Sequence, residues 1–219
     1  MPDAEDDAGV VEMNTADAMN TSGTFDVLAN DSDADGGSLR VIDATAANGT
    51  VFEENGKLTY TPDEGFLGND TVHYKVDSGD GTASASAKLE IYVNADPEAK
   101  DDAGSVAMNT SGTFDVLAND SDANEEETLS VTSAAADNGS VAIEEDGRLT
   151  YTPNDGFFGE DTVKYTIEDE HKATDTADLI VTVIEAETEE EVEDDSNDSF
   201  AEVFAAVGVF MLILMASGM

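Results

Sequence analysis

The chain has 219 residues and a formal net charge of −43 at pH 7, from 51 Asp and Glu against 8 Lys and Arg. Such a charge repels phosphate, which excludes nucleic acid as a partner and favours cations, although solubility or a saline habitat is a second interpretation of it. Cys is absent, so disulfides, thiolate metal sites and cysteine catalysis are excluded. The opening MPDAEDDAGV holds neither a basic stretch nor an apolar run, and no ordinary cleavable signal peptide is expected there.

An internal repeat divides the chain. The 17-residue segment AMNTSGTFDVLANDSDA occurs at residues 18–34 and again, unchanged, at residues 107–123. Further on, KLTYTPDEGFLGNDTVHY is matched by RLTYTPNDGFFGEDTVKY. Duplication on this scale predicts two copies of one packing unit, a first domain over residues 4–94 and a second over residues 96–184. The linker between them is short and contains Pro97, which restricts the backbone.

Alternating apolar and polar side chains predict β-strands in each copy. Residues 71–76 and 83–93 both alternate with the period of two that is typical of a strand with one buried face. Asn-Gly at 55–56 and Asp-Gly at 146–147 stand between apolar segments and predict tight hairpin turns. About six or seven short strands in about 90 residues favour a two-sheet sandwich. The predicted fold class is all-β, with two tandem immunoglobulin- or cadherin-like β-sandwiches.

The order of motifs supports the same architecture. Each copy reads DD, then DVLANDSDA, NG, LTYTP, GF, G, DT and Y, over about four fifths of the chain in total. This set resembles the cadherin-like and immunoglobulin-like tandem repeats of bacteria, of the VCBS-like type found in large secreted adhesins. The resemblance implies an exported, rod-like module that is often stabilised by calcium, and it implies no particular ligand.

The first copy contains a candidate metal site. Asp31, Asp33 and Asp35 precede Gly36 in the pattern D-x-D-x-D-G, where alternate carboxylates around a sharp turn can converge on one Ca²⁺ ion. The Glu that completes a helical calcium loop is missing and strands flank the segment, so the pattern favours a β-loop site over an EF-hand. A polar turn that caps nearby backbone amides is the competing interpretation.

The second copy departs from this pattern. Asp120, Asp122 and Asn124 occupy the ligand positions, but Glu125 stands where the Gly belongs, which leaves the occupancy of this second site open. Two further candidate ligands lie at the joint between the copies, Asp101 and Asp102. Exposed loop carboxylates are the competing interpretation of that pair. The predicted cofactor is structural Ca²⁺.

Catalytic motifs are missing from the sequence. His73 and His171 lie in different copies and belong to no recognisable nucleophile or zinc set. The Gly-containing turns are acidic and lead into strands, which is the wrong charge and context for binding phosphate. We therefore expect a binding or structural protein and not an enzyme.

The C-terminal part changes character twice. Residues 185–198 are mostly acidic and predict an extended, self-repelling linker. Residues 199–219 carry Glu202 as their only charge, and about 20 residues at helical rise match the roughly 30 Å of a bilayer core, which predicts a transmembrane helix. A hydrophobic terminal signal and a helix buried in an assembly are competing interpretations. A stripe of small residues offers a face for helix packing: Ala201, Ala205 and Gly208.

Two hypotheses for function follow. The first is a single-pass, membrane-anchored protein whose calcium-stabilised β-domains serve adhesion or spacing on the extracytoplasmic side, in the periplasm or at the cell surface. The second is an accessory subunit of a larger membrane complex, with its helix packed on the helices of transmembrane partner subunits. No Lys or Arg follows Lys172, so the side of the membrane is inferred from the resemblance alone.

Overall fold

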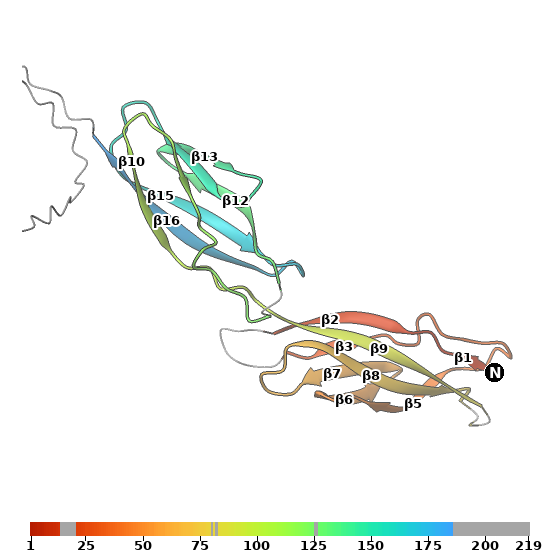
Figure 1. The fold of residues 1–219 in the computed structure, drawn as a ribbon. Helices are drawn as coiled ribbons and strands as arrows, with labels where there is room; N and C mark the ends of the chain where they lie inside the picture. The colour runs from red at the N-terminus through yellow and green to blue at the C-terminus, as the bar shows by residue number, and fades with distance from the viewer. Residues whose placement is uncertain (14–20, 80, 82, 125–126, 186–219) are drawn as a thin grey trace, which may run out of the picture. The chain divides into compact units, whose positions relative to one another are not determined.

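The computed structural model describes residues 1–13, 21–79, 81, 83–124 and 127–185 (Figure 1). In these residues the secondary structure is all strand, which confirms the predicted all-β class. The acidic linker beyond Glu185 and the predicted transmembrane helix, with Ala201, Ala205 and Gly208, lie outside the described residues. Within the described part of the chain, no helix has the length and apolarity of a transmembrane segment.

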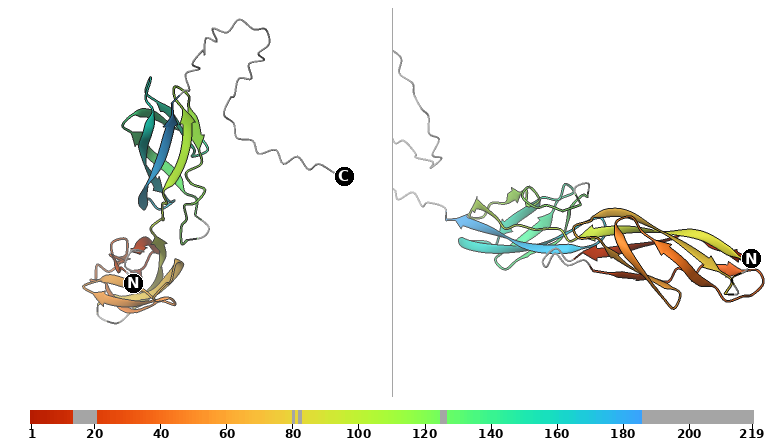
Figure 2. Two further views of the ribbon diagram at one scale, coloured as in Figure 1. Left: turned by 90° about the vertical axis from the view of Figure 1, so that its left-hand side faces the viewer. Right: turned by 90° about the horizontal axis from the view of Figure 1, so that it is seen from below.

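The first copy is built from a four-stranded and a three-stranded sheet (Figures 1 and 2). The larger sheet has the order β2-β9-β8-β5, with β2 parallel to β9 and the other neighbours antiparallel. Its strands are β2 (Asp7–Met13), β5 (Arg40–Thr45), β8 (Gly68–Asp77) and β9 (Ser84–Ala95). The smaller sheet, in the order β3-β7-β6, holds β3 (Gly23–Phe25), β6 (Gly49–Glu54) and β7 (Lys57–Pro62). A short pair, β1 (Pro2–Asp3) with β4 (Ser32–Asp33), lies beside them.

The second copy repeats this topology. Its larger sheet has the order β10-β16-β15-β12, with β10 parallel to its neighbour β16. Its smaller sheet has the order β11-β14-β13. The larger sheet holds β10 (Asp102–Ala107), β12 (Ser130–Ala136), β15 (Gly159–Glu168) and β16 (Thr174–Ile184). The smaller sheet holds β11 (Gly112–Phe114), β13 (Gly139–Ile143) and β14 (Leu149–Pro153). The two immunoglobulin-like domains predicted from the repeat are therefore present.

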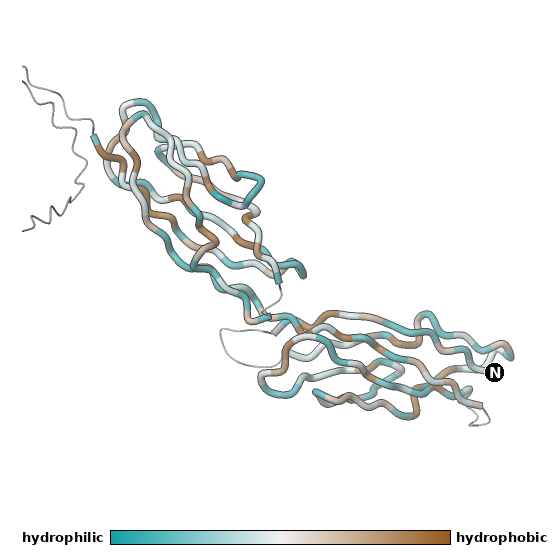
Figure 3. Tube along the Cα trace, viewed as in Figure 1, coloured by the Kyte–Doolittle hydropathy of each residue, from teal (hydrophilic) through white to brown (hydrophobic). Residues whose placement is uncertain are grey.

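Every second side chain of the long strands enters the core, as the alternation predicts. Figure 3 colours the chain trace by hydropathy, and apolar residues recur along the strands of both copies. Along β8, Val72, Tyr74 and Val76 are at most 1% exposed, while His73 between them is exposed. Burial of such side chains is the main favourable term in folding. The same positions of β9, β15 and β16 are also buried: Leu89, Ile91, Val93, Val163, Tyr165, Ile167, Leu179, Val181 and Val183.

The predicted hairpin turn between β6 and β7 is also present. Asn55 and Gly56 both adopt positive φ, at 53° and 82°, a conformation that Asn and Gly tolerate best. In the second copy Gly147 adopts a φ of 83° but Asp146 has no positive φ, and the last strand pair is Ile143 with Leu149, so the predicted hairpin forms there through a longer turn. The Asn-Gly turn thus helps to set the register of β6 and β7 in the first copy.

A buried carboxylate explains why several short motifs recur together. Asp70, which is 4% exposed, accepts hydrogen bonds from the backbone N–H of Asn48 (2.9 Å) and of Thr71 (2.8 Å) and from the hydroxyl of Tyr60 (2.9 Å). These donors lie in the NG, DT and LTYTP motifs, so one acid ties three segments of the sandwich together. The second copy builds the same network from Asn138, Tyr151, Asp161 and Thr162.

Candidate cation site

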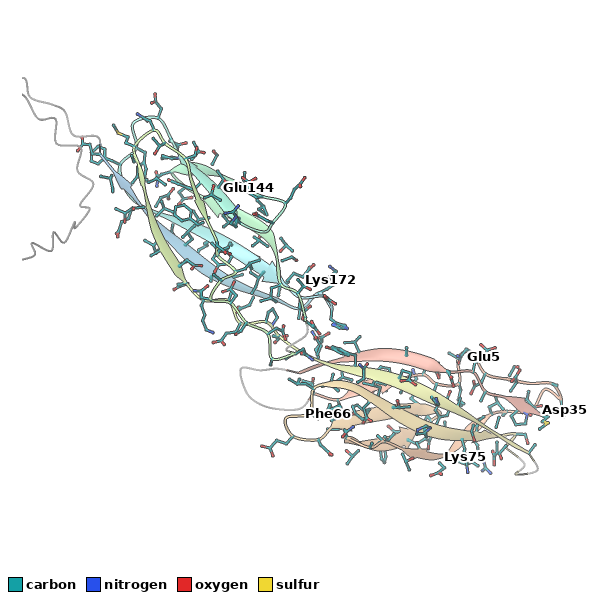
Figure 4. The ribbon with its side chains drawn as sticks, viewed as in Figure 1. Glu5, Asp35, Phe66, Lys75, Glu144 and Lys172 are labelled. Carbon is teal, nitrogen blue, oxygen red and sulfur yellow. The ribbon has the colours of Figure 1, made fainter. Side chains whose placement is uncertain are left out.

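Three carboxylates converge at one end of the second copy. One oxygen from each of Asp122, Glu127 and Asp169 lies within 4.8 Å of the others. Asp122 follows the bridge residue Ser121, Glu127 lies ahead of β12, and Asp169 follows β15. Because β12 and β15 are antiparallel neighbours, their pairing brings Glu127 and Asp169 together. We call this set the carboxylate cluster; Lys172, labelled in Figure 4, marks the turn between β15 and β16 that carries Asp169.

Several oxygens at the cluster are buried and have no hydrogen-bond donor. They are Asp122 Oδ2, Glu127 Oε2 and the amide oxygen of Asn94. The side chain of Glu127 is 5% exposed, and Asn94 is fully buried. Leaving a buried acceptor without a partner costs free energy, and the cost is larger for a charged one. A positive charge between these oxygens would offset that cost.

The remaining oxygens of the cluster are held in place by protein donors. Asp122 Oδ1 accepts the N–H of Asn124 at 2.7 Å, and Asp169 Oδ1 accepts the N–H of His171 at 2.8 Å. Glu127 Oε1 accepts the hydroxyl of Tyr92 at 2.5 Å and lies 3.1 Å from Nδ1 of His171. One oxygen of both Asp122 and Glu127 is therefore fixed while the other is left for a ligand, which is the arrangement of a preorganised site.

Burial and mutual repulsion make the cluster costly without a counter-charge. Burial is the main cause that raises the pKa of Asp122, and the neighbouring carboxylates of Glu127 and Asp169 raise it further. Burial likewise raises the pKa of the Tyr92 hydroxyl to about 12, with the hydrogen bond to Glu127 as the next cause. Burial is the larger cause of both shifts, and the neighbouring carboxylates act in the same direction.

The end of β9 contacts the loops that carry the cluster. Asn94 donates from Nδ2 to Asp169 Oδ2 at 2.7 Å, and the N–H of Ala95 donates to Asn124 Oδ1 at 2.7 Å. The ring of Tyr92 stacks on that of His171 with centroids 4.1 Å apart. The amide oxygen of the predicted ligand Asn124 thus accepts a hydrogen bond from the backbone of β9. Asn124 therefore links the two copies and is not one of the three acids of the cluster.

Asp31 and Asp120, the first acids of the two predicted motifs, lie in a second environment. Each binds a backbone N–H through one oxygen, that of Glu5 at 2.8 Å and that of Lys100 at 2.7 Å, and keeps its other oxygen buried without a donor. Burial is the largest cause that raises the pKa of both. The repeat therefore reproduces this arrangement in each copy.

The predicted pair at the joint belongs to this second environment. Asp102 accepts a hydrogen bond from the hydroxyl of Tyr165 at 3.0 Å. Burial is the largest cause that raises the pKa of Asp120, and the charge of Asp102 raises that pKa further. Asp101 accepts the N–H of Asp178 at 2.9 Å, so it fixes β16. Asp101 and Asp102 thus hold parts of the second sandwich by hydrogen bonds, and neither is one of the three acids of the carboxylate cluster.

In the first copy the structure brings Asp33 and Asp35 to one positive charge. The N-terminal ammonium lies 2.9 Å from Asp33 Oδ1 and 2.8 Å from Asp35 Oδ2. The side chain of Asp33 is 1% exposed, whereas that of Asp35, labelled in Figure 4, is 88% exposed. The sequence pattern therefore placed two of its three acids together, with Asp31 elsewhere.

Glu127, Asp169 and Asn94 were missed from the sequence. They lie in separate loops and on β9, and only strand pairing and the junction bring them to Asp122. A comparison of the two copies offered one signal. Glu127 and Asp169 are acids in loops of the second copy, and the first copy has no acid at the corresponding loop positions although the two copies are otherwise very similar.

Comparison with known proteins agrees with the fold. The family described as Bacterial Ig domain matches residues 2–91 and residues 94–182. No curated protein matches the chain.

Similar solved structures include titin domains I67–I69, at 11% identity and a TM-score of 0.47 over 84% of this chain and 65% of that one. The human desmocollin-1 ectodomain is 12% identical with a TM-score of 0.37, over 84% of this chain and 42% of that one. The endo-fucoidan hydrolase MfFcnA4 is 14% identical with a TM-score of 0.31, over 84% of this chain. The chain spans 29% of the length of that hydrolase.

Proposed function

The chain belongs to the bacterial Ig-domain family, which accounts for both copies, and we propose that it is a calcium-stabilised, membrane-anchored adhesion or spacer protein. In this proposal the two domains lie on the extracytoplasmic side and have no catalytic role. The observation that carries the calcium part is the carboxylate cluster with its buried, unpartnered oxygens.

The donor set suits a hard divalent cation. Asp122, Glu127 and Asp169 supply carboxylate oxygens, and Asn94 supplies an amide oxygen close by. Ca²⁺ takes six to eight oxygen ligands in adaptable geometry, with water filling the remainder, whereas Mg²⁺ demands a near-ideal octahedron. Irregularly placed loop carboxylates therefore favour Ca²⁺.

Calcium at this place would order the junction between the copies. The cluster lies in the second copy, but Asn94 hydrogen-bonds Asp169, and Tyr92 hydrogen-bonds Glu127. Glu127 and Asp169 hold the end of β9 through these two hydrogen bonds, so an ion that fixes the two acids also fixes the end of β9. A spacer or adhesive protein requires such a junction, because a loose linker would let neighbouring domains reorient.

Melting curves of the full chain in detergent test the calcium part. Excess Ca²⁺ should raise the midpoint by several degrees over chelator, since an ion at 100 times its Kd adds about 2.7 kcal/mol to the folded state. Because a strongly acidic chain responds to any salt, NaCl of equal ionic strength and Mg²⁺ serve as controls. Identical midpoints in Ca²⁺ and chelator would overturn calcium stabilisation.

The membrane part of the proposal comes from the sequence beyond the described residues. The apolar run over residues 199–219 has the length of a bilayer span. Fractionation tests it: the full chain should remain in the membrane pellet through an alkaline wash, and a chain ending at residue 185 should not. Release of the full chain by that wash would contradict anchoring.

A second candidate, an accessory subunit, is favoured by the small residues Ala201, Ala205 and Gly208 of that run. Small residues let helix backbones approach closely inside a bilayer. Stoichiometric co-purification with a multi-helix protein in mild detergent would support the subunit. A free monomer under the same conditions would support the self-standing anchored protein.

A further inference from the structure

The two copies differ at the loop ends that form the carboxylate cluster. Strand register defines the equivalent positions: Arg40 opposite Asp77 corresponds to Ser130 opposite Glu168. The residue that follows each of these paired acids is Ser78 in the first copy and Asp169 in the second.

Counting back from the same register places Glu127 three residues before Ser130 and Gly37 three residues before Arg40. Asp33 and Asp122 are equivalent within the unchanged 17-residue segment, and both accept the N–H two residues on. The first copy therefore keeps one carboxylate of three and carries Gly and Ser in place of the others.

The residues next to Gly37 support this equivalence, and they would have to shift by a few tenths of an ångström to admit a side chain there. A Cβ atom built there would lie 3.3 Å from Asp33 Oδ2 and 3.2 Å from the carbonyl oxygen of Ser78. A side chain at position 37 would thus start close to both Asp33 and Ser78, as Glu127 lies close to both Asp122 and Asp169. The first copy has the architecture of the site but not its ligands.

We infer that the chain binds one Ca²⁺ ion with high affinity, in the second copy, and that Glu127 and Asp169 decide which copy binds it. The inference rests on the proposed calcium function and adds its location and number. The aspartate motif shared by both copies is not sufficient, because Asp33 and Asp122 are the same residue in the same local sequence. The second copy brings together three acids with unpartnered buried oxygens, whereas in the first copy Asp33 lies with the exposed Asp35 at the N-terminal ammonium, so the second copy attracts a cation more strongly.

Calorimetric titration of the full chain with Ca²⁺ in detergent, at high NaCl to screen weak surface binding, tests the inference. The expected result is one tight site per chain. Tb³⁺ provides a second readout, since Tyr92 hydrogen-bonds Glu127 at 2.5 Å and the chain has no Trp, so an ion there should give tyrosine-sensitised luminescence.

A matched pair of variants locates the ion. Asp122→Asn should raise the Kd for Ca²⁺ by roughly 10- to 100-fold or more, and Asp33→Asn should leave it unchanged. Two tight sites in the native chain, or equal effects of the two variants, would overturn the location while leaving calcium binding intact. No tight site at all would overturn the proposed calcium function and this inference with it.

A gain-of-function variant keeps the test decisive if Asp122→Asn fails to fold. The double substitution Gly37→Glu with Ser78→Asp restores both missing carboxylates to the first copy. It should raise the number of tight Ca²⁺ sites from one to two, with far-UV circular dichroism as the check on folding. A folded double variant with one tight site would show that these positions do not decide binding.

Discussion

Asp70 and Glu127 are both buried carboxylates, but they are surrounded in opposite ways. Asp70 accepts two hydrogen bonds from Asn48, one from the backbone of Thr71 and one from the hydroxyl of Tyr60. Glu127 keeps one oxygen for Tyr92 and His171 and leaves the other buried with no donor. The sequence shows only an acid in each case.

Asp70 and the carboxylate cluster also differ in the direction in which their surroundings shift the carboxyl pKa. Burial acts to raise the pKa of Asp70, but the hydrogen bonds from Asn48, Thr71 and Tyr60 outweigh it and leave that pKa below its usual value. At the carboxylate cluster, burial and like charges raise the pKa of Asp122. A carboxylate that accepts hydrogen bonds from several donors is stable as an anion and has a structural role. A carboxylate surrounded by other carboxylates is stabilised when a cation binds.

The largest expected effect comes from breaking the satisfied carboxylate. Asp70→Asn replaces an acceptor oxygen by an NH₂ group that faces N–H and O–H donors, so we expect a loss of about 3 kcal/mol in the free energy of unfolding. Urea unfolding measures it. Glu64→Gln, an equal charge change at an exposed position, is the control and should change stability little.

A loss of less than about 0.5 kcal/mol in Asp70→Asn would contradict the role of the network. The equivalent substitution Asp161→Asn should destabilise the second copy comparably, because its donors repeat those of Asp70. Unequal effects would indicate that the two sandwiches differ in more than the cation site.

The pH dependence of stability gives the next test. A carboxylate whose pKa is lower in the folded state adds stability that is complete above its unfolded pKa, about 3.9, and is lost as the pH falls through its folded pKa. Asp70 has such a lowered pKa. Its contribution should therefore disappear below about pH 4, and the acid limb of the stability curve should be flatter in Asp70→Asn than in the native chain. Equal acid limbs would contradict it.

The effect of Glu127→Gln on the free energy of unfolding should change sign when Ca²⁺ is added. Without Ca²⁺, the substitution removes a buried charge and supplies an NH₂ donor beside Asp122, so the free energy of unfolding should rise by about 1 kcal/mol. With Ca²⁺ in excess it removes a ligand and should lower stability by about 2 kcal/mol. Paired denaturation curves in chelator and in Ca²⁺ measure both. Destabilisation of the same size in both conditions would show that Glu127 has a packing role only.

The sandwiches were predictable because their signals are local. Alternation over residues 71–76 describes a strand with one buried face, and Asn55 with Gly56 describes a turn with positive φ. Each such signal depends on neighbours in sequence. The internal repeat then supplied a second, independent example of every element.

The candidate site was only partly predictable because its members are distant in sequence. Asp122 was selected from its motif, but Glu127 and Asp169 meet only through the pairing of β12 with β15. Motif spacing favoured the first copy, where the D-x-D-x-D-G pattern is complete, yet the three carboxylates converge in the second. Spacing describes one loop, whereas a cation site of this kind is assembled from three.

A further expected effect, one that calcium should not change, concerns the link between the copies. Asn124 is 7% exposed, accepts the N–H of Ala95 at 2.7 Å and donates to the carbonyl of Val93 at 3.1 Å. Asn124→Ala should cost about 1–2 kcal/mol, because it leaves a buried N–H and a buried carbonyl without partners. Since the side-chain amide of Asn124 bonds the backbone of β9 and the hydroxyl of Tyr92, and no oxygen of Asn124 is left for an ion, its loss should lower the free energy of unfolding by the same amount in chelator and in Ca²⁺. An effect seen only with Ca²⁺ would make Asn124 a ligand after all, as its sequence motif suggests.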